Sequence, residues 1–132
     1  MKLVDTTFLI DALKGELSAA EKARELDEEG GVATTAVNVY EIAYGVHSRK
    51  SDAAYRVDAL ERLLSNLDVL PLDQVSALRA AEITGGLDRT GEHVDPFDAL
   101  IAGIALENGV DCLVTRNTKH FKRIKGLKIE TY

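Results

Sequence analysis

Short apolar runs alternate with helical patterns along the whole chain, and this alternation restricts the folds that it can adopt. Strand patterns lie at residues 2–5, 32–34, 68–70, 112–115 and 127–129. Helical patterns separate them, after residue 5 and at 18–29, 35–46, about 52–66, 73–87 and 95–108. Strands separated by helices need crossover connections, which favour a parallel sheet. The sequence therefore predicts an α/β fold with a central parallel sheet of about five strands and helices on both faces.

Capping residues indicate where most of these helices begin. The candidates are Thr6 or Thr7, Ser18 with Glu21 as a capping box, Thr35, Asp73, and Asp95 followed by Pro96. Proline is well suited to the first helical position because the N–H that it lacks has no partner there. The pattern predicts a helix after nearly every strand.

Length and composition predict a single domain over residues 1–132. The chain is 45% hydrophobic and 29% charged, as in ordinary globular proteins. No apolar segment approaches the roughly 20 residues that span a bilayer, and Asp5 stands where a signal peptide would continue its apolar core. We therefore expect a cytoplasmic protein without a membrane partner. The single cysteine, Cys112, excludes an internal disulfide and is interpreted as a buried structural thiol.

Three carboxylates, Asp5, Glu41 and Asp98, each stand as the only charge in an otherwise apolar stretch. Burying a carboxylate costs several kcal/mol unless it is paired, neutralised or bound to a cation. Helix capping also explains Asp5, and favourable first-turn electrostatics also explain Asp98. Glu41 lies in the middle of a helix, where capping offers nothing. The three together favour a shared site at the carboxyl ends of the strands, where open parallel sheets form their sites.

A cluster of carboxylate oxygens suits Mg²⁺ or Mn²⁺ better than zinc, which prefers cysteine and histidine ligands. His47, His93 and His120 are scattered without the spacing of metal ligands. We interpret His47 and His93 as surface residues and His120 as a weaker candidate for a phosphate contact.

The net charge of −6 is unevenly distributed along the chain. Residues 116–132 carry six basic side chains and one acidic side chain, although the rest of the chain is strongly acidic. Such a segment can bind phosphate locally despite the overall sign of the charge. A solvated surface segment explains the same composition equally well.

Four segments, taken in order, resemble the motifs of PIN-domain ribonucleases, specifically the VapC-like toxins of prokaryotic toxin–antitoxin pairs. They are Val4-Asp5-Thr6, residues 40–46 with Glu41, residues 98–102 with Asp98, and residues 113–121 with Thr115, Arg116 and Asn117. The similarity extends over essentially the whole chain. Each motif is short and degenerate, but the four in register form a specific signal.

The resemblance implies a PIN-like three-layer sandwich and a Mg²⁺-dependent endoribonuclease in which Mn²⁺ can substitute. It implies Asp5, Glu41 and Asp98 as metal ligands and catalytic residues, with Asn117 beside them in the catalytic set. It implies substrate contacts from Thr6, Thr115, Arg116 and Lys119. The implied partners are an RNA substrate, a cognate antitoxin protein and a second copy of the chain in a homodimer.

One departure from the family pattern leaves alternatives open. Many relatives have an acid where Asn117 stands, and an amide oxygen can bind Mg²⁺ but brings no charge. The number of metals therefore stays open, and so does a catalytically silent PIN scaffold that acts by binding protein. A haloacid-dehalogenase-like phosphatase is a further alternative because residues 3–7 resemble its nucleophile motif, although Thr7 stands where that motif needs a second Asp.

Overall fold

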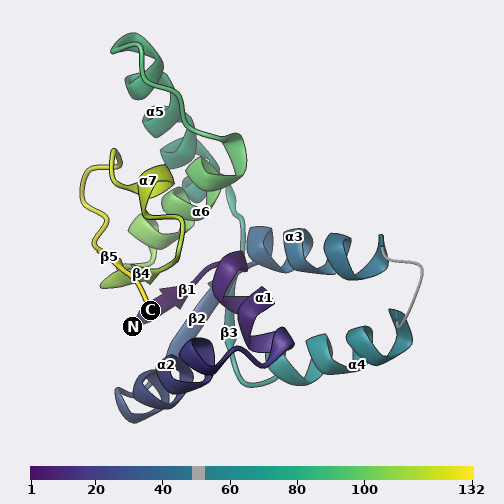
Figure 1. Ribbon diagram of the computed structural model, residues 1–132. Coiled ribbons are helices and arrows are strands. Elements are labelled where there is room, and N and C mark those ends of the chain that lie inside the picture. The colour runs from purple at the N-terminus through teal and green to yellow at the C-terminus, as the bar shows by residue number, and fades with distance from the viewer. Residues whose placement is uncertain (49–52) are drawn as a thin grey trace.

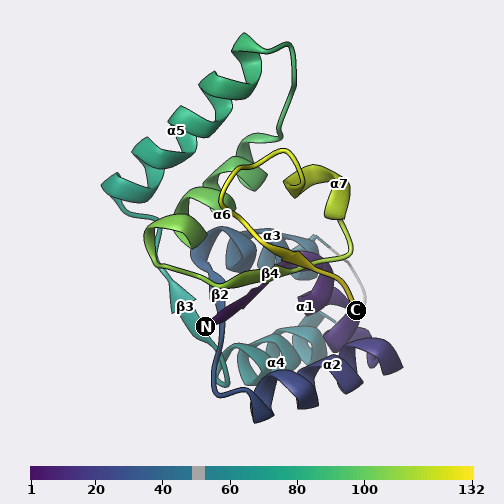
Figure 2. The same ribbon diagram turned by 90° about the vertical axis from the view of Figure 1, so that its left-hand side faces the viewer.

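The computed structural model describes residues 1–48 and 53–132, which form a central sheet with helices on both faces (Figures 1 and 2). The strands are β1 (Lys2–Val4), β2 (Val32–Thr35), β3 (Asp68–Leu70), β4 (Cys112–Val114) and β5 (Ile129–Glu130). The helices are α1 (Thr6–Lys14), α2 (Leu17–Glu28), α3 (Ala36–His47), α4 (Ala53–Leu64), α5 (Gln74–Arg89), α6 (Pro96–Glu107) and α7 (Thr118–Phe121). The predicted α/β fold and parallel five-stranded sheet are confirmed.

The strand order β3-β2-β1-β4-β5 creates a switch point between β1 and β4. From β1 the chain adds β2 and β3 on one side, and later adds β4 and β5 on the other. β1 pairs in parallel with β4, with Leu3 opposite Leu113 and Val4 opposite Val114. The residues that follow these strands, Asp5 and Thr115, therefore leave the same edge of the sheet side by side. This is the position at which open α/β sheets form their sites.

Alternating side chains of the central strands enter two separate hydrophobic cores. Leu3 and Leu113 pack with α5, α6 and α7 on one face of the sheet. Val4 and Val114 pack with α1, α2, α3 and α4 on the other face. Figure 1 shows the same division, with α5, α6 and α7 lying apart from α1, α2 and α4. The sheet thus forms the middle layer of a three-layer sandwich.

Two of the predicted caps are wrong. Asp5, rather than Thr6 or Thr7, caps α1, because its carboxylate accepts the backbone N–H of Phe8. Helix α2 begins after Glu16 without a side-chain cap, and the hydroxyl of Ser18 accepts a hydrogen bond from Arg116 instead of capping the helix.

The caps at Thr35, Asp73 and Asp95 are confirmed. Strand β5 begins at Ile129, two residues later than predicted, because Ile129 is the residue that aligns with Leu113. The predicted start of α4 near residue 52 lies outside the described residues. The short helix α7 was not predicted.

Cys112 is a free, buried thiol, as predicted. His47 and His93 are both exposed, also as predicted. Within the described part of the chain, no helix combines the length and apolar character that crossing a membrane requires.

Candidate active site

Asp5 lies at the switch point and is almost fully buried, with 4% of its surface exposed. One carboxylate oxygen accepts hydrogen bonds from the Thr7 hydroxyl at 2.6 Å and from the Phe8 backbone N–H at 3.2 Å. The other accepts from the hydroxyl of the fully buried Thr115. Burial raises the pKa of Asp5, and these hydrogen bonds oppose that shift. A nearby cation would stabilise the ionised form.

Glu41 reaches toward the same edge from α3. Its carboxylate accepts a hydrogen bond from Thr6 at 2.8 Å, and Thr6 in turn accepts one from Asn38 at 3.0 Å. Asn38 is fully buried and completes a capping box with Thr35. Burial raises the pKa of Glu41, and the neighbouring Asp98 and Asp5 charges raise it further. Asn38, a member of the capping box, therefore also helps to orient Glu41 through Thr6.

Asp98 comes from the first turn of α6, directly after the cap at Asp95. Its carboxylate lies 2.9 Å from Nδ1 of His120. Burial raises the pKa of Asp98 against this hydrogen bond, and the charges of Asp95 and Asp5 add to the increase. The predicted trio of Asp5, Glu41 and Asp98 thus shares one electrostatic environment.

The segment after β4 contributes Thr115, Arg116 and Asn117. Thr115 also accepts a hydrogen bond from the Asn117 backbone at 2.9 Å. The guanidinium of Arg116 pairs with Asp11 at 3.2 Å and lies 5.0 Å from the centre of the Tyr132 ring. Arg116 is therefore beside the site, but its charge is partly compensated.

Asn117 and Lys119 are exposed at the start of α7. They follow Thr115 by two and four residues, and they present an amide and an ammonium group to solvent. The structure thus leaves both available for the contacts that the sequence predicted.

The carboxylates do not converge into a complete set of metal ligands. Among residues 1–48 and 53–132, no group of three or more His, Cys, Asp or Glu side chains is placed to hold a metal ion. Asp5 is held by Thr7 and Thr115, and Asp98 is turned toward His120. The donors are nevertheless the hard oxygens that Mg²⁺ and Mn²⁺ prefer, and all three carboxylates lie where burial opposes their charge. The residues therefore fit a divalent cation by the chemistry of their donor atoms, although the Asp98 carboxylate contacts His120 in this structure.

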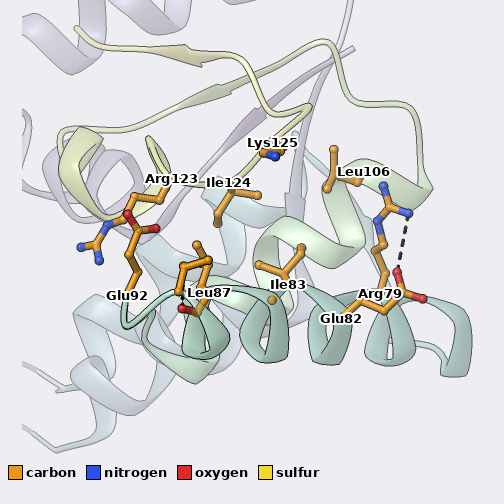
Figure 3. A pocket seen from close by; sticks show the side chains of 11 residues that line it. Arg79, Glu82, Ile83, Leu87, Glu92, Leu106, Arg123, Ile124 and Lys125 are labelled. Carbon is orange, nitrogen blue, oxygen red and sulfur yellow. Dashed lines mark hydrogen bonds and ion pairs between the residues drawn. The ribbon is translucent and has the colours of Figure 1, made fainter.

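A hollow between α5 and the segment 123–125 lies away from these acids (Figure 3). Its volume is about 570 Å³, and Ile83, Leu87 and Ile124 contribute apolar side chains to its lining. None of the three carboxylates lines it. Its size does not make it the active site, because the groups able to perform chemistry lie at the switch point.

Sequence reasoning missed three supporting interactions: the hydrogen bond of Thr7 to Asp5, that of Asn38 to Thr6, and the contact of His120 with Asp98. Thr7 had a signal, since a hydroxyl two residues after a buried Asp can reach its carboxylate. Asn38 had one as well, because it occupies the third helical position after Thr35. The contact of His120 with Asp98 bridges 22 residues and has no local signature.

The PIN domain family model matches residues 2–127. The chain therefore belongs to the PIN domain family. This membership also removes the phosphatase alternative, whose second acid is absent at Thr7.

Individual relatives are similar over nearly their full length. The tRNA(fMet)-specific endonuclease VapC of Shigella flexneri is 32% identical over 131 residues, which cover 98% of this chain and 96% of the relative. The structure of VapBC2 from Rickettsia felis, bound to a DNA fragment from its promoter, matches with a TM-score of 0.90 and 26% identity, covering 99% of this chain and 98% of that chain. VapBC-5 from Mycobacterium tuberculosis, a member of the VapBC family of toxin–antitoxin systems, matches with a TM-score of 0.71 and 25% identity, covering 98% of this chain and 95% of that chain.

Proposed function

We propose that this protein is an endoribonuclease and the toxin of a toxin–antitoxin pair. The observation that supports the proposal is that Asp5, Glu41 and Asp98 lie toward one edge of a PIN fold, where the charges of Asp98 and Asp5 add to the burial that raises the pKa of Glu41. The full-length similarity to an endonuclease specific for a tRNA supports RNA as the substrate. The similarity to toxin–antitoxin proteins supports a cognate antitoxin as the partner.

Asp5, Glu41 and Asp98 would hold Mg²⁺, or Mn²⁺ in its place. The cation would supply Lewis acidity toward the scissile phosphate and lower the pKa of a bound water. These three carboxylates would supply the charged ligands of one ion. Asn117 offers an uncharged oxygen, so a second ion would need additional oxygen atoms from the substrate phosphate.

The remaining groups of the site orient these acids and bind the substrate. Thr115 and Thr7 fix the rotamer of Asp5 by donating to opposite oxygens of its carboxylate. Thr6, itself oriented by Asn38, fixes Glu41. Such partners of ligating carboxylates typically alter metal affinity or activity by roughly 10–100-fold when removed.

Arg116 and Lys119 provide positive charge toward the RNA backbone. Lys119 is exposed and can contact phosphate directly. Arg116 would have to exchange part of its contact with Asp11 for phosphate. We place the protein in the cytoplasm as a homodimer, in keeping with an RNA substrate and an antitoxin partner.

Cleavage of structured RNA by the purified protein tests the proposal. Activity is expected with Mg²⁺ or Mn²⁺ and not with a chelator. Asp98→Asn is expected to reduce kcat by roughly 100-fold or more, since even partners of metal ligands cost roughly 10–100-fold. Asp88→Asn, an exposed carboxylate at the end of α5, is the matched control and should cleave like the wild type. Equal cleavage by Asp98→Asn and the wild type would overturn the proposed chemistry, and no cleavage by the wild type with either metal would favour the silent scaffold.

Thermal unfolding gives a second measurement that does not depend on activity. The three acids repel one another without a cation, so Mn²⁺ should raise the Tm of the wild-type protein. Asp98→Asn should raise the metal-free Tm at neutral pH, because it removes a charge that burial disfavours, and should reduce the response to Mn²⁺. A wild-type Tm that saturating Mn²⁺ does not change would contradict the metal site.

A further inference from the structure

Three aromatic rings gather on the surface beside the acids: Tyr40, Tyr44 and Phe97, which we call the aromatic ledge. Their exposed fractions are 58%, 65% and 40%. The rings of Tyr40 and Tyr44 are nearly parallel, at 20° with centroids 6.2 Å apart. Phe97 packs edge-on against Tyr40 at 5.7 Å. The ledge thus contains three of the seven phenylalanine and tyrosine residues of the chain.

The ledge directly adjoins the residues of the proposed active site. Tyr40 immediately precedes Glu41 on α3, and Phe97 immediately precedes Asp98 on α6. Successive helical residues point about 100° apart, so Glu41 can turn toward Thr6 while Tyr40 faces outward. The contact between Tyr40 and Phe97 joins the two helices that supply these acids. The ledge is therefore held in a fixed relation to Glu41 and Asp98.

Packing within the chain does not require these rings to be exposed. The other described phenylalanines, Phe8 and Phe121, are buried in the two cores. Neighbouring exposed aromatic side chains, unlike scattered ones, usually indicate a binding surface. Aromatic rings bind nucleobases by stacking, which is the main means by which proteins hold unpaired nucleotides.

We propose that the aromatic ledge stacks unpaired nucleobases of the RNA next to the scissile phosphate. This inference rests on the proposed function and specifies its substrate as RNA that is single-stranded at the cleavage point. Bases within a duplex cannot present their faces to the ledge. The acids of the site repel the RNA backbone, and Arg116 is already paired with Asp11. Stacking supplies an attraction that does not depend on charge.

A second copy of the chain or an antitoxin segment would also cover an exposed aromatic surface. The observations favour RNA because Tyr40 and Phe97 each directly precede one of the proposed catalytic acids, on two different helices. The other two occupants are distinguished by the measurements below.

Steady-state cleavage of a hairpin RNA with an unpaired loop tests the ledge. Tyr44→Leu and Phe97→Leu should raise KM by about 5- to 150-fold, the range that loss of one stacked base produces, with little change in kcat. Tyr44→Phe keeps the ring and should keep the wild-type KM. Leu78→Ala, an equally exposed apolar residue on α5, is the control for surface changes. An unchanged KM in both leucine variants would overturn the proposal.

Fluorescence provides a test that is independent of cleavage. The chain contains no tryptophan, so Tyr44→Trp introduces a single reporter on the ledge. An unpaired oligonucleotide should quench it, and the same sequence in a duplex should not. Leu78→Trp, a reporter away from the acids, should not respond to either RNA. Equal quenching of Tyr44→Trp by duplex and unpaired RNA would overturn the proposal.

The two readouts separate the failure of the ledge from the failure of the nuclease. If the wild type cleaves RNA and the leucine variants have an unchanged KM, the stacking role of the ledge is contradicted and the nuclease activity is supported. If unpaired RNA selectively quenches Tyr44→Trp but the protein cleaves no RNA, the stacking role of the ledge is supported and the nuclease activity is contradicted. Sedimentation tests for contact between copies. A Tyr44→Leu variant whose assembly has a lower mass than that of the wild type, but whose KM is unchanged, would assign the surface to contact between copies and would overturn the proposal. A Tyr44→Leu variant that loses antitoxin binding but retains its KM assigns it to the antitoxin, with the same consequence.

Discussion

Both oxygens of the Asp5 carboxylate accept hydrogen bonds. One carboxylate oxygen caps α1 by accepting the Phe8 N–H, and the other accepts from Thr115 across the switch point. A carboxylate has about four lone-pair sites, so capping does not exclude a second role. The local pattern allowed both interpretations because it could not show what approaches the second oxygen.

The identities of the charged residues could be predicted, but not their supporting contacts. Glu41 and Asp98 were recognisable because each is a lone charge among apolar neighbours. Their partners Thr6 and His120 come from other elements and contact them only after folding. The metal-ligand roles of Asp5, Glu41 and Asp98 stay a prediction.

Glu130 shows how an ion-pair network outside the site affects stability. It pairs with Lys2 and with Lys22, whose side chain is buried. The hydrogen bonds from Lys22 and Lys2 lower the pKa of Glu130 to about 2. Because the folded-state pKa lies below the usual value of 4.5, the stabilisation is complete above pH 4.5 and is lost as the pH falls toward 2.

Urea denaturation of Glu130→Gln at several pH values measures this contribution. The variant should be less stable than the wild type at pH 7, since the buried Lys22 then loses one carboxylate partner, Glu130, and keeps the more exposed Glu25. The difference should shrink as the pH falls below 4.5. A difference that is independent of pH would show that packing of the side chain, rather than its charge, accounts for the loss. Glu28→Gln, an exposed acid at the end of α2, is the control.

The starts of helices could be predicted from the sequence where the capping interaction joins residues only two or three positions apart. The caps at Thr35, Asp73 and Asp95 satisfy backbone donors two or three residues ahead, so the sequence contains everything they need. Ser18 fits the same pattern, but Arg116 from a segment 98 residues away occupies its hydroxyl. The start of β5 likewise depends on its alignment with β4. Long-range contacts decided each of these differences.

The packing of α5 against α6 depends on Gly103. A Cβ at this position would lie 2.5 Å from the Ser76 carbonyl oxygen and 2.9 Å from the Ala80 backbone nitrogen. Gly103→Ala should therefore destabilise the protein by about 1–3 kcal/mol, the usual cost of overpacking, despite the better helix propensity of alanine.

Gly85 provides the matched control on the partner helix. No atom lies within 4 Å of a Cβ built there, so Gly85→Ala should stabilise the protein by up to about 1 kcal/mol. Chemical denaturation of the two variants should give free-energy changes of opposite sign. Stabilisation by both substitutions would show that α5 and α6 can move apart at no cost. Which of the two glycines lies at a close contact depends on how α5 and α6 pack, and no local sequence pattern indicates it.

For the molecule as a whole, the sequence predicted the class of fold, but not which basic side chains form ion pairs and which are exposed to solvent. The alternation of strands and helices determines a parallel sheet almost by itself. The basic segment 116–132 was visible as well, but the structure divides it. Arg116 pairs with Asp11, whereas Lys119 is exposed at the start of α7. The assignment of residues 1–132 to a single domain stays a prediction.

This division predicts which basic side chain carries the salt dependence of RNA binding. Each phosphate contact that is lost should reduce the slope of log K against log salt by about 0.7 to 0.9. Lys119→Ala should therefore weaken binding at low salt and flatten the slope by about one unit. Arg24→Ala, which removes an exposed charge from α2, should leave the slope unchanged.

Titration of labelled RNA at a series of salt concentrations, under conditions without cleavage, makes the comparison. Arg116→Ala should flatten the slope less than Lys119→Ala, because Arg116 must give up contact with Asp11 before it can neutralise a phosphate. Equal slopes for Lys119→Ala and the wild type would show that α7 does not face the RNA backbone. The acids would then have to receive their substrate from the side of α3, where the aromatic ledge lies.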